Sequence, residues 1–313
     1  MSMKRLLPIL IFLAAASPAS AALTCNGSSK LCGKRFDRVV LPATHNSMSA
    51  ASLGFQIPNQ PVGIPDQLKD GVRGFLIDTH YGRRQADGSV VTDDDGKATQ
   101  GKRSAYLCHV VCQIGATPLE PVLRSMRSFL RKHPGNVLLL DVEDYVTPKD
   151  FVKAMRRSGL ARYAYRGSTK RWPTLRTMIK RHQQVVVLDE HRGGAAPWIH
   201  LDYLGIVQET TYTWDPATLI TDPANWPASC APNRGGTTGS LLLMNHWSPP
   251  TPRPQPDPVA DAQVNATGVL VGRARACQAA RGLLPTIVAV DQYRTGGLFD
   301  AVRQLNGLTP ASA

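Results

Sequence analysis

Eight short runs rich in valine, isoleucine and leucine recur along this chain of 313 residues, and segments with helical spacing separate most of them. A strand followed by a helix, repeated in this way, is typical of a parallel β-sheet covered by helices. Eight such units in a chain of this length match a single-domain α/β fold, the (β/α)8 TIM-type barrel. The expected strands are residues 38–45, 72–79, 106–110, 136–144, 184–190, 204–209, 240–246 and 286–292.

A doubly wound open sheet is the structural alternative. Such sheets usually have fewer strands, and no glycine-rich phosphate-binding turn follows the first expected strand. Two helix starts are clear, because Thr117 and Thr147 are each followed by a proline and, three positions after the threonine, by an acidic residue. These signals predict helices that run to about Lys132 and Arg157.

The N-terminus has the features of a secretory signal peptide. Two basic residues precede an apolar run at 6–16, and the small-residue triplet Ala-Ser-Ala follows at 19–21. The apolar run is too short to cross a bilayer, and the triplet is typical of a cleavage site. We expect residues 1–21 to be removed and residues 22–313 to form the barrel domain of a secreted or periplasmic protein.

Six cysteines follow the expected signal peptide. An even number of cysteines in an exported protein favours disulfides over metal thiolates. Six cysteines permit about fifteen connectivities, so only proximity in the sequence guides the pairing. Proximity gives Cys25 with Cys32, Cys108 with Cys112, and Cys230 with Cys277.

The formal charge of +13 is unevenly distributed, since residues 124–181 hold 15 lysines and arginines against four acids. A solvated surface that aids solubility is one interpretation. Attraction to an anionic membrane surface is another, worth about 1 kcal/mol per basic residue near the lipid. Nucleic acid is not an expected partner, because no pattern of stacking aromatic residues accompanies the basic segment.

Polar residues occupy the end of each expected strand. In a parallel barrel the carboxyl ends of all strands meet at one mouth, where active sites are built. We therefore expect these side chains to converge, and burying so many ionisable groups without a purpose would cost several kcal/mol. The strand-end residues are His45, Asp78, His109, Glu143, Asp189, Glu190, Glu209, Asn245, His246 and Asp291.

Four local motifs occur in one order: LPATHNSMS at 41–49, QLKDGVRGFLID at 67–78, Cys-His at 108–109 and VLLLDVE at 137–143. Together they resemble the catalytic X-region of phosphatidylinositol-specific phospholipase C and the broader PLC-like phosphodiesterase superfamily. The resemblance spans about residues 36–306. Toward the C-terminus, residues 261–279 and 288–291 resemble the corresponding half of secreted bacterial members. It implies a phosphoric diester hydrolase that acts on a phosphoinositide-type lipid head group through a cyclic phosphate.

The resemblance also implies roles for three residues. Cleavage of a phosphodiester by a neighbouring hydroxyl needs a base, an acid and positive charge near the phosphoryl oxygens. His45 would be the base acting on the inositol 2-hydroxyl, and His109 the acid serving the diacylglycerol oxygen, although the two assignments can be exchanged. Asp291 would orient the first histidine and fix its tautomer.

Calcium is the cofactor that the resemblance implies. Asn46, Asp78 and Glu143 match three calcium-ligand positions of the family, and oxygen ligands suit this ion. The fourth position is Leu76 here. Metal-independent bacterial members place an arginine where this sequence has Asp78, whereas Arg73 lies at the strand's start and is expected to be structural.

Two other classes of function remain open. A glycerophosphodiesterase or sphingomyelinase D-type barrel would need paired acids on the second strand, where this sequence has Leu76-Ile77-Asp78. A catalytically silent barrel that binds anionic lipid or glycan would not need His45 and His109 on separate strands. We expect a monomer whose ligand is a phospholipid head group or a related phosphodiester.

Overall fold

The computed structural model describes residues 23–213, 220–248 and 256–309. The expected signal peptide at 1–21 lies outside them. Within these ranges every helix is too short or too polar to cross a bilayer.

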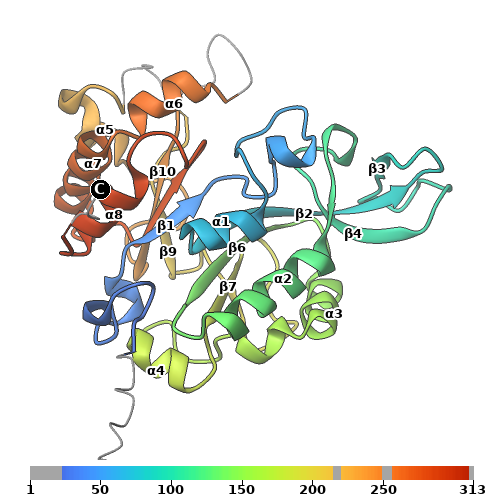
Figure 1. The fold of residues 1–313 in the computed structure, drawn as a ribbon, viewed down its shortest axis with the longest axis horizontal. Helices are drawn as coiled ribbons and strands as arrows, with labels where there is room; N and C mark the ends of the chain where they lie inside the picture. Colours follow the sequence, from blue (N-terminus) through green and yellow to red (C-terminus); the bar gives the residue numbers. More distant parts are fainter. Residues whose placement is uncertain (1–22, 214–219, 249–255, 310–313) are drawn as a thin grey trace, which may run out of the picture.

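Eight parallel strands form a curled sheet in the ring order of a (β/α)8 barrel (Figure 1). The order β8-β7-β6-β2-β1-β11-β10-β9 follows the chain around the ring. Within the described residues no ladder joins β8 to β9, so the ring stays open at that junction, which we call the seam. The strands are β1 (Leu41–Thr44), β2 (Gly74–Arg84), β6 (Leu138–Asp144), β7 (Val185–Asp189), β8 (Ile199–Leu201), β9 (Val207–Glu209), β10 (Leu241–His246) and β11 (Ile287–Val290).

The expectation that residues 106–110 form a barrel strand is wrong. Residues 103–107 form β4 (Arg103–Leu107), which runs antiparallel to the outer half of β2. With β3 (Val90–Thr92) and β5 (Thr117–Pro118) it builds an arm that projects beside the barrel (Figure 1). The first three residues of β4 are not buried, whereas barrel strands such as β7 are buried throughout. The missing barrel strand is β8, which is too short to give a sequence signal.

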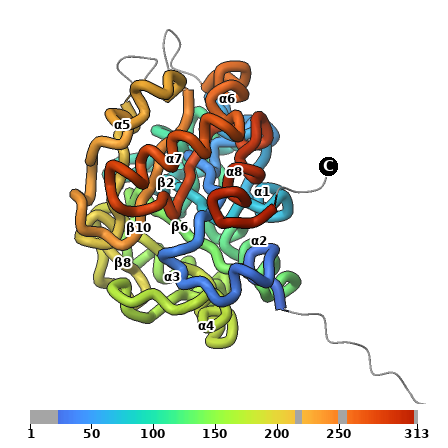
Figure 2. The backbone as a smooth tube through the Cα atoms, turned by 90° about the vertical axis from the view of Figure 1, so that its left-hand side faces the viewer, coloured from blue at the N-terminus to red at the C-terminus, as the bar shows by residue number. Residues whose placement is uncertain are grey.

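Helices cover the outer face of the sheet, and α7 and α8 lie side by side there (Figure 2). Thr147 accepts a hydrogen bond from the Asp150 amide, as its position before a proline predicts. Thr117 does not cap its helix, because it lies in β5 and pairs with β4. The helices are α1 (Ile64–Asp70), α2 (Leu119–Lys132), α3 (Pro148–Ser158), α4 (Leu175–Lys180), α5 (Trp226–Ser229), α6 (Pro258–Val264), α7 (Thr267–Arg281) and α8 (Leu298–Leu305).

Strand alternation divides the core into two layers. On β6, Leu138 and Leu140 pack in the layer that includes the helices, whereas Leu139 packs inside the barrel with residues of β1, β7, β10 and β11. Because successive side chains of a strand point to opposite faces, Asp141 and Glu143 share the inner face with Leu139. The chain therefore carries two carboxylates toward the carboxyl-terminal mouth of the barrel.

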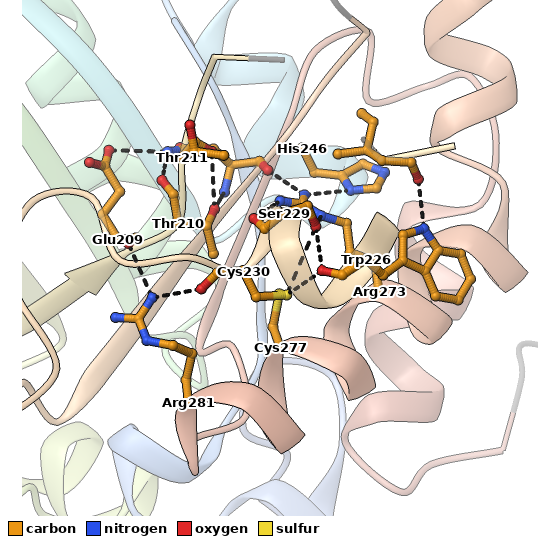
Figure 3. Close-up of a disulfide and its surroundings, with 12 residues drawn as sticks. Glu209, Thr210, Thr211, Trp226, Ser229, Cys230, His246, Arg273, Cys277 and Arg281 are labelled. Atoms are coloured by element: carbon orange, nitrogen blue, oxygen red, sulfur yellow. Dashed lines mark hydrogen bonds between the residues drawn. A yellow bond between two sulfur atoms is a disulfide. The ribbon is translucent and has the colours of Figure 1, made fainter. Parts of the chain in front are cut away.

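The structure joins the three cysteine pairs that sequence proximity suggests: Cys25–Cys32, Cys108–Cys112 and Cys230–Cys277. The third pair fastens the segment after α5 to α7 (Figure 3). Beside it, the fully buried Arg273 of α7 donates to Ser229 Oγ at 2.8 Å and contacts His246 Nδ1 at 3.0 Å. Helix α7 is thereby fixed to the end of β10.

Candidate active site

A pocket of about 420 Å³ opens at the carboxyl ends of the strands. Of the residues that the sequence assigns to catalysis or calcium binding, four line its wall, namely His45, Asn46, Asp78 and Glu143. They come from the ends of β1, β2 and β6, which are far apart in the chain but neighbours in the sheet. This is the mouth expected for a parallel barrel.

His45 is held by a carboxylate. Its Nδ1 donates to Asp291 Oδ1 at 3.0 Å, and Asn59 Nδ2 donates to the other oxygen of Asp291 at 3.0 Å. Gln60 fixes the backbone here, because its Nε2 donates to the carbonyls of His45 at 2.7 Å and Val290 at 2.9 Å. A proton kept on Nδ1 leaves Nε2 of His45 free to accept another.

The ring of Trp247 stacks on His45, with 3.9 Å between ring centroids and 9° between the ring planes. Among the other tryptophans, Trp198 is a buried core residue, and Trp226 donates to the Ile220 carbonyl. Trp214 lies outside the described residues. Stacking limits rotation of the imidazole and shields one of its faces from water.

His109 follows β4 rather than a barrel strand, yet it reaches the same mouth. Asn46 Nδ2 donates to His109 Nε2 at 3.1 Å. The neighbouring residues have unusual backbone angles, since Asn46 has a φ of 43° and Val110 a φ of 62°. A left-handed backbone conformation is strained at a valine. Val110 lies within the five-residue loop that the Cys108–Cys112 disulfide closes, so the disulfide restrains the loop in this conformation.

The environment of His109 disfavours a charged ring. Burial, followed by the nearby charge of His45, lowers the pKa of His109 from 6.5 to about 4. Its Nδ1 is buried and has no hydrogen-bond partner among the described residues. Since Asn46 Nδ2 donates to His109 Nε2, that ring nitrogen accepts and carries no proton in this arrangement.

An acidic wall faces the two histidines. Asp78 and Glu143 are direct neighbours in the β2–β6 register. Burial, together with the charges of Glu143 and Glu190, raises the pKa of Asp78 well above its ordinary value. The Tyr145 hydroxyl donates to Glu143 at 2.6 Å. These oxygens fit a hard cation, because close, buried carboxylates repel one another unless a positive charge lies between them.

Arg234 also lines the pocket, and sequence reasoning missed it. It forms ion pairs with Glu190 at 2.6 Å and Glu209 at 2.8 Å, and its guanidinium lies 4.3 Å from the ring centroid of Tyr203. Hydrogen bonding to Glu209 and these charges outweigh burial and raise the pKa of Arg234. The residue lies in the irregular loop between α5 and β10, where no strand or helix pattern marks it.

Other strand-end residues are structural. His246 accepts from Arg273 and donates to the Val264 carbonyl, and burial, followed by the Arg273 charge, lowers its pKa to about 3. Asn245 donates to Glu209 at 3.1 Å. Asp189 accepts from the Arg192 amide at the end of β7. Outside the pocket, Arg73 donates to Asn136 at 2.8 Å, as expected for a structural residue.

Comparison with known proteins gives one family. The PI-PLC X family model, described as PI-PLC X 1, matches residues 31–306. A PI-PLC X domain-containing protein of Arabidopsis thaliana is 24% identical, and the match covers 88% of this chain but 63% of that protein. The chain thus spans less than two thirds of the length of this relative.

Two solved structures share the fold. Phosphatidylinositol-specific phospholipase C of Listeria monocytogenes is 16% identical, with a TM-score of 0.50 over 88% of this chain and 94% of that one. A mutant of the corresponding Staphylococcus aureus enzyme is 14% identical, with a TM-score of 0.53 over the same shares. At these identities the likeness concerns the fold alone.

Proposed function

The chain belongs to the PI-PLC X family, and on that premise we propose that it is a phosphoric diester hydrolase that cleaves a phosphoinositide-type lipid head group. The reaction begins when a hydroxyl of the head group attacks the phosphorus and the bond to the lipid oxygen breaks. A cyclic phosphate and a neutral lipid alcohol are the products of this first step.

The observation that carries the proposal is the pairing of two differently supported histidines at one mouth. His45 has a carboxylate on Nδ1 and offers Nε2 as the base that takes the hydroxyl proton. His109, held through Asn46, gives a proton to the departing oxygen. An anionic phosphate between the rings would favour the protonated form of His109, against the burial that lowers its pKa to about 4.

Positive charge for the phosphoryl oxygens belongs to the same proposal. Asn46, Asp78 and Glu143 would hold a calcium ion through oxygen atoms, and their clustered carboxylates fit such an ion. When bound, the ion would stabilise negative charge on the phosphate. Without a cation, the acidic wall would repel the substrate.

The surroundings of the mouth support contact with a membrane. Exposed apolar side chains follow the strand ends there, with Val110 65%, Tyr145 45%, Leu204 76% and Tyr212 44% exposed. Such residues can enter a lipid interface and bring a head group to the pocket. Three disulfides are consistent with a protein exported after removal of residues 1–21.

Phosphorus NMR of the mature protein with phosphatidylinositol vesicles tests this function. We expect a cyclic inositol phosphate signal that is lost in His45→Ala and in His109→Ala and reduced by a calcium chelator. The matched control is His133→Ala, because His133 is exposed at the end of α2, away from the pocket.

Other outcomes would select the alternatives. Turnover of glycerophosphodiesters or sphingomyelin, but not phosphatidylinositol, would indicate the glycerophosphodiesterase or sphingomyelinase D class. Vesicle binding without any phosphorus product would indicate a catalytically silent lipid-binding barrel.

A further inference from the structure

Three carboxylates meet below the proposed calcium ligands, at the ends of the three strands on one side of the seam. Asp141 lies on β6, Glu190 directly follows β7, and Asp202 directly follows β8. One ligand oxygen from each lies within 4.8 Å of the others. Two oxygens bound to one calcium ion at about 2.4 Å each can be at most about 4.8 Å apart, so the spacing fits a shared cation.

The second observation is that three buried oxygens, two on Asp141 and one on Asp202, accept no hydrogen bond from an N–H or hydroxyl group of the described residues. Asp141 is 2% exposed, and no N–H or hydroxyl group among the described residues donates to either of its oxygens; the polar group that reaches it is the Asp202 carboxyl, which could bond it only by sharing a proton. Asp202 is fully buried; one of its oxygens accepts from the Tyr203 amide, and Oδ2 has no partner among those residues. A buried carboxylate left without hydrogen bonds costs several kcal/mol unless something binds it.

The nearby guanidinium is already committed. Arg234 donates to Glu190 Oε2 at 2.6 Å and makes its other carboxylate contacts with Glu209. The other oxygen of Glu190 remains free to turn toward Asp141 and Asp202. With Glu209, which shares Arg234, the four carboxylates and one guanidinium carry a formal charge of −3, which one divalent cation would reduce to −1.

The strand register separates this group from the proposed calcium ligands. Asp78 lies beside Glu143, whereas Asp141 lies beside Leu76, two residues deeper in the barrel. Asp202 lies near the seam, directly after a three-residue strand that pairs with β7. The group thus joins the ends of β6, β7 and β8.

We propose that Asp141, Glu190 and Asp202 hold a hard divalent cation of their own, of the calcium or manganese type, which fastens the short strand β8 to its neighbours. The cation is structural and is distinct from the one proposed at Asn46, Asp78 and Glu143. Its presence does not depend on the phosphodiesterase activity.

The test measures cation binding and thermal unfolding of the mature, chelator-treated protein without substrate. Calorimetric titration with Ca²⁺ and Mn²⁺ compares wild type with Asp202→Asn and with the control Asp78→Asn. We expect Asp202→Asn to lose one equivalent of bound cation, or to bind it at least tenfold more weakly, and to lose the matching rise in Tm. Asp78→Asn should retain that equivalent and that rise.

The isosteric Asp141→Asn is the second variant, and far-UV circular dichroism confirms that each variant folds. The proposal is overturned if wild type binds no cation, which would mean that Asp141 and Asp202 share a proton instead. It is also overturned if Asp202→Asn binds as wild type does, or if Asp78→Asn removes the same equivalent. Because no substrate is present, an inactive protein leaves the test unaffected.

Discussion

The two histidines at the mouth are held in opposite ways. Around His45, the neighbouring side chains of Asp291, Asn59 and Trp247 fix the ring through a carboxylate, an amide and a stacked indole. Around His109, no carboxylate contacts the ring among the described residues, and a disulfide loop holds its backbone in place. The ring of His45 is positioned by a charged partner and that of His109 by covalent geometry. Different substitutions should therefore displace the two rings.

Asp291→Asn should have the largest effect. An amide can keep the shape of the pair but cannot enforce the same tautomer of His45, so we expect kcat to fall by about 10³ to 10⁴, as when other acid–histidine pairs are broken. Steady-state turnover of phosphatidylinositol measures this. The surface variant Asp66→Asn serves as the control, and a fall of less than tenfold in Asp291→Asn would show that His45 does not need its carboxylate.

Removal of the Cys108–Cys112 disulfide by a double serine substitution should come next. The strained Val110 loop would relax and move His109, and misplacement by about 1 Å costs about 100-fold in rate. The double variant of Cys25 and Cys32 is a matched control, because it opens another short loop remote from the pocket. Loop entropy predicts a loss of about 2 kcal/mol of stability for each pair. Equal loss of activity in the two variants would refute a positioning role.

The pH dependence of stability should also separate the two rings. The pKa of folded His109 is about 4, below its ordinary 6.5, so between these values the unfolded chain binds more protons and stability falls as pH falls. From pH 7 to pH 5 this group should cost about 2 kcal/mol. Urea unfolding at the two pH values should show a smaller decrease in the free energy of unfolding for His109→Gln than for wild type. The control His133→Gln should show the same decrease as wild type. Identical decreases in all three would contradict the buried, neutral ring.

Trp247→Leu should have the smallest effect. Loss of an aromatic stack is worth about 1 kcal/mol, or about fivefold in kcat/KM, because His45 keeps its carboxylate. Trp247→Phe should restore most of this. A loss above 100-fold for Trp247→Leu would mean that stacking, rather than Asp291, positions the ring.

Much of this arrangement follows from local sequence pattern. The buried runs that end in His45, Asp78, Glu143 and Asp291 identify strands, and parallel topology alone brings their ends together. Alternation along 141–143 also places the carboxylates of Asp141 and Glu143 on one face, so the sequence itself carries a signal for Asp141. His109 lies at the mouth, as its place after an apolar run predicts, but that run is a strand of the antiparallel arm and not a barrel strand.

The remaining features have no local signal. β8 has three residues, and its place depends on pairing with β7. Arg234 reaches Glu190 and Glu209 across 44 and 25 residues of sequence, through an irregular loop. Such contacts are set by how the ring of strands curls, so the sequence alone does not predict them.

The seam between β8 and β9 has a consequence for motion. An edge strand of three residues has few backbone bonds to break, so amide deuterium should enter β8 and β9 before it enters β6 or β1. Arg234 spans this seam, since it pairs with Glu190 after β7 and with Glu209 on β9, so opening there would break one of these ion pairs while His45 and His109 keep their own supports. The barrel would then open transiently along the seam, and a bulky ligand would be able to enter between β8 and β9 as well as through the mouth.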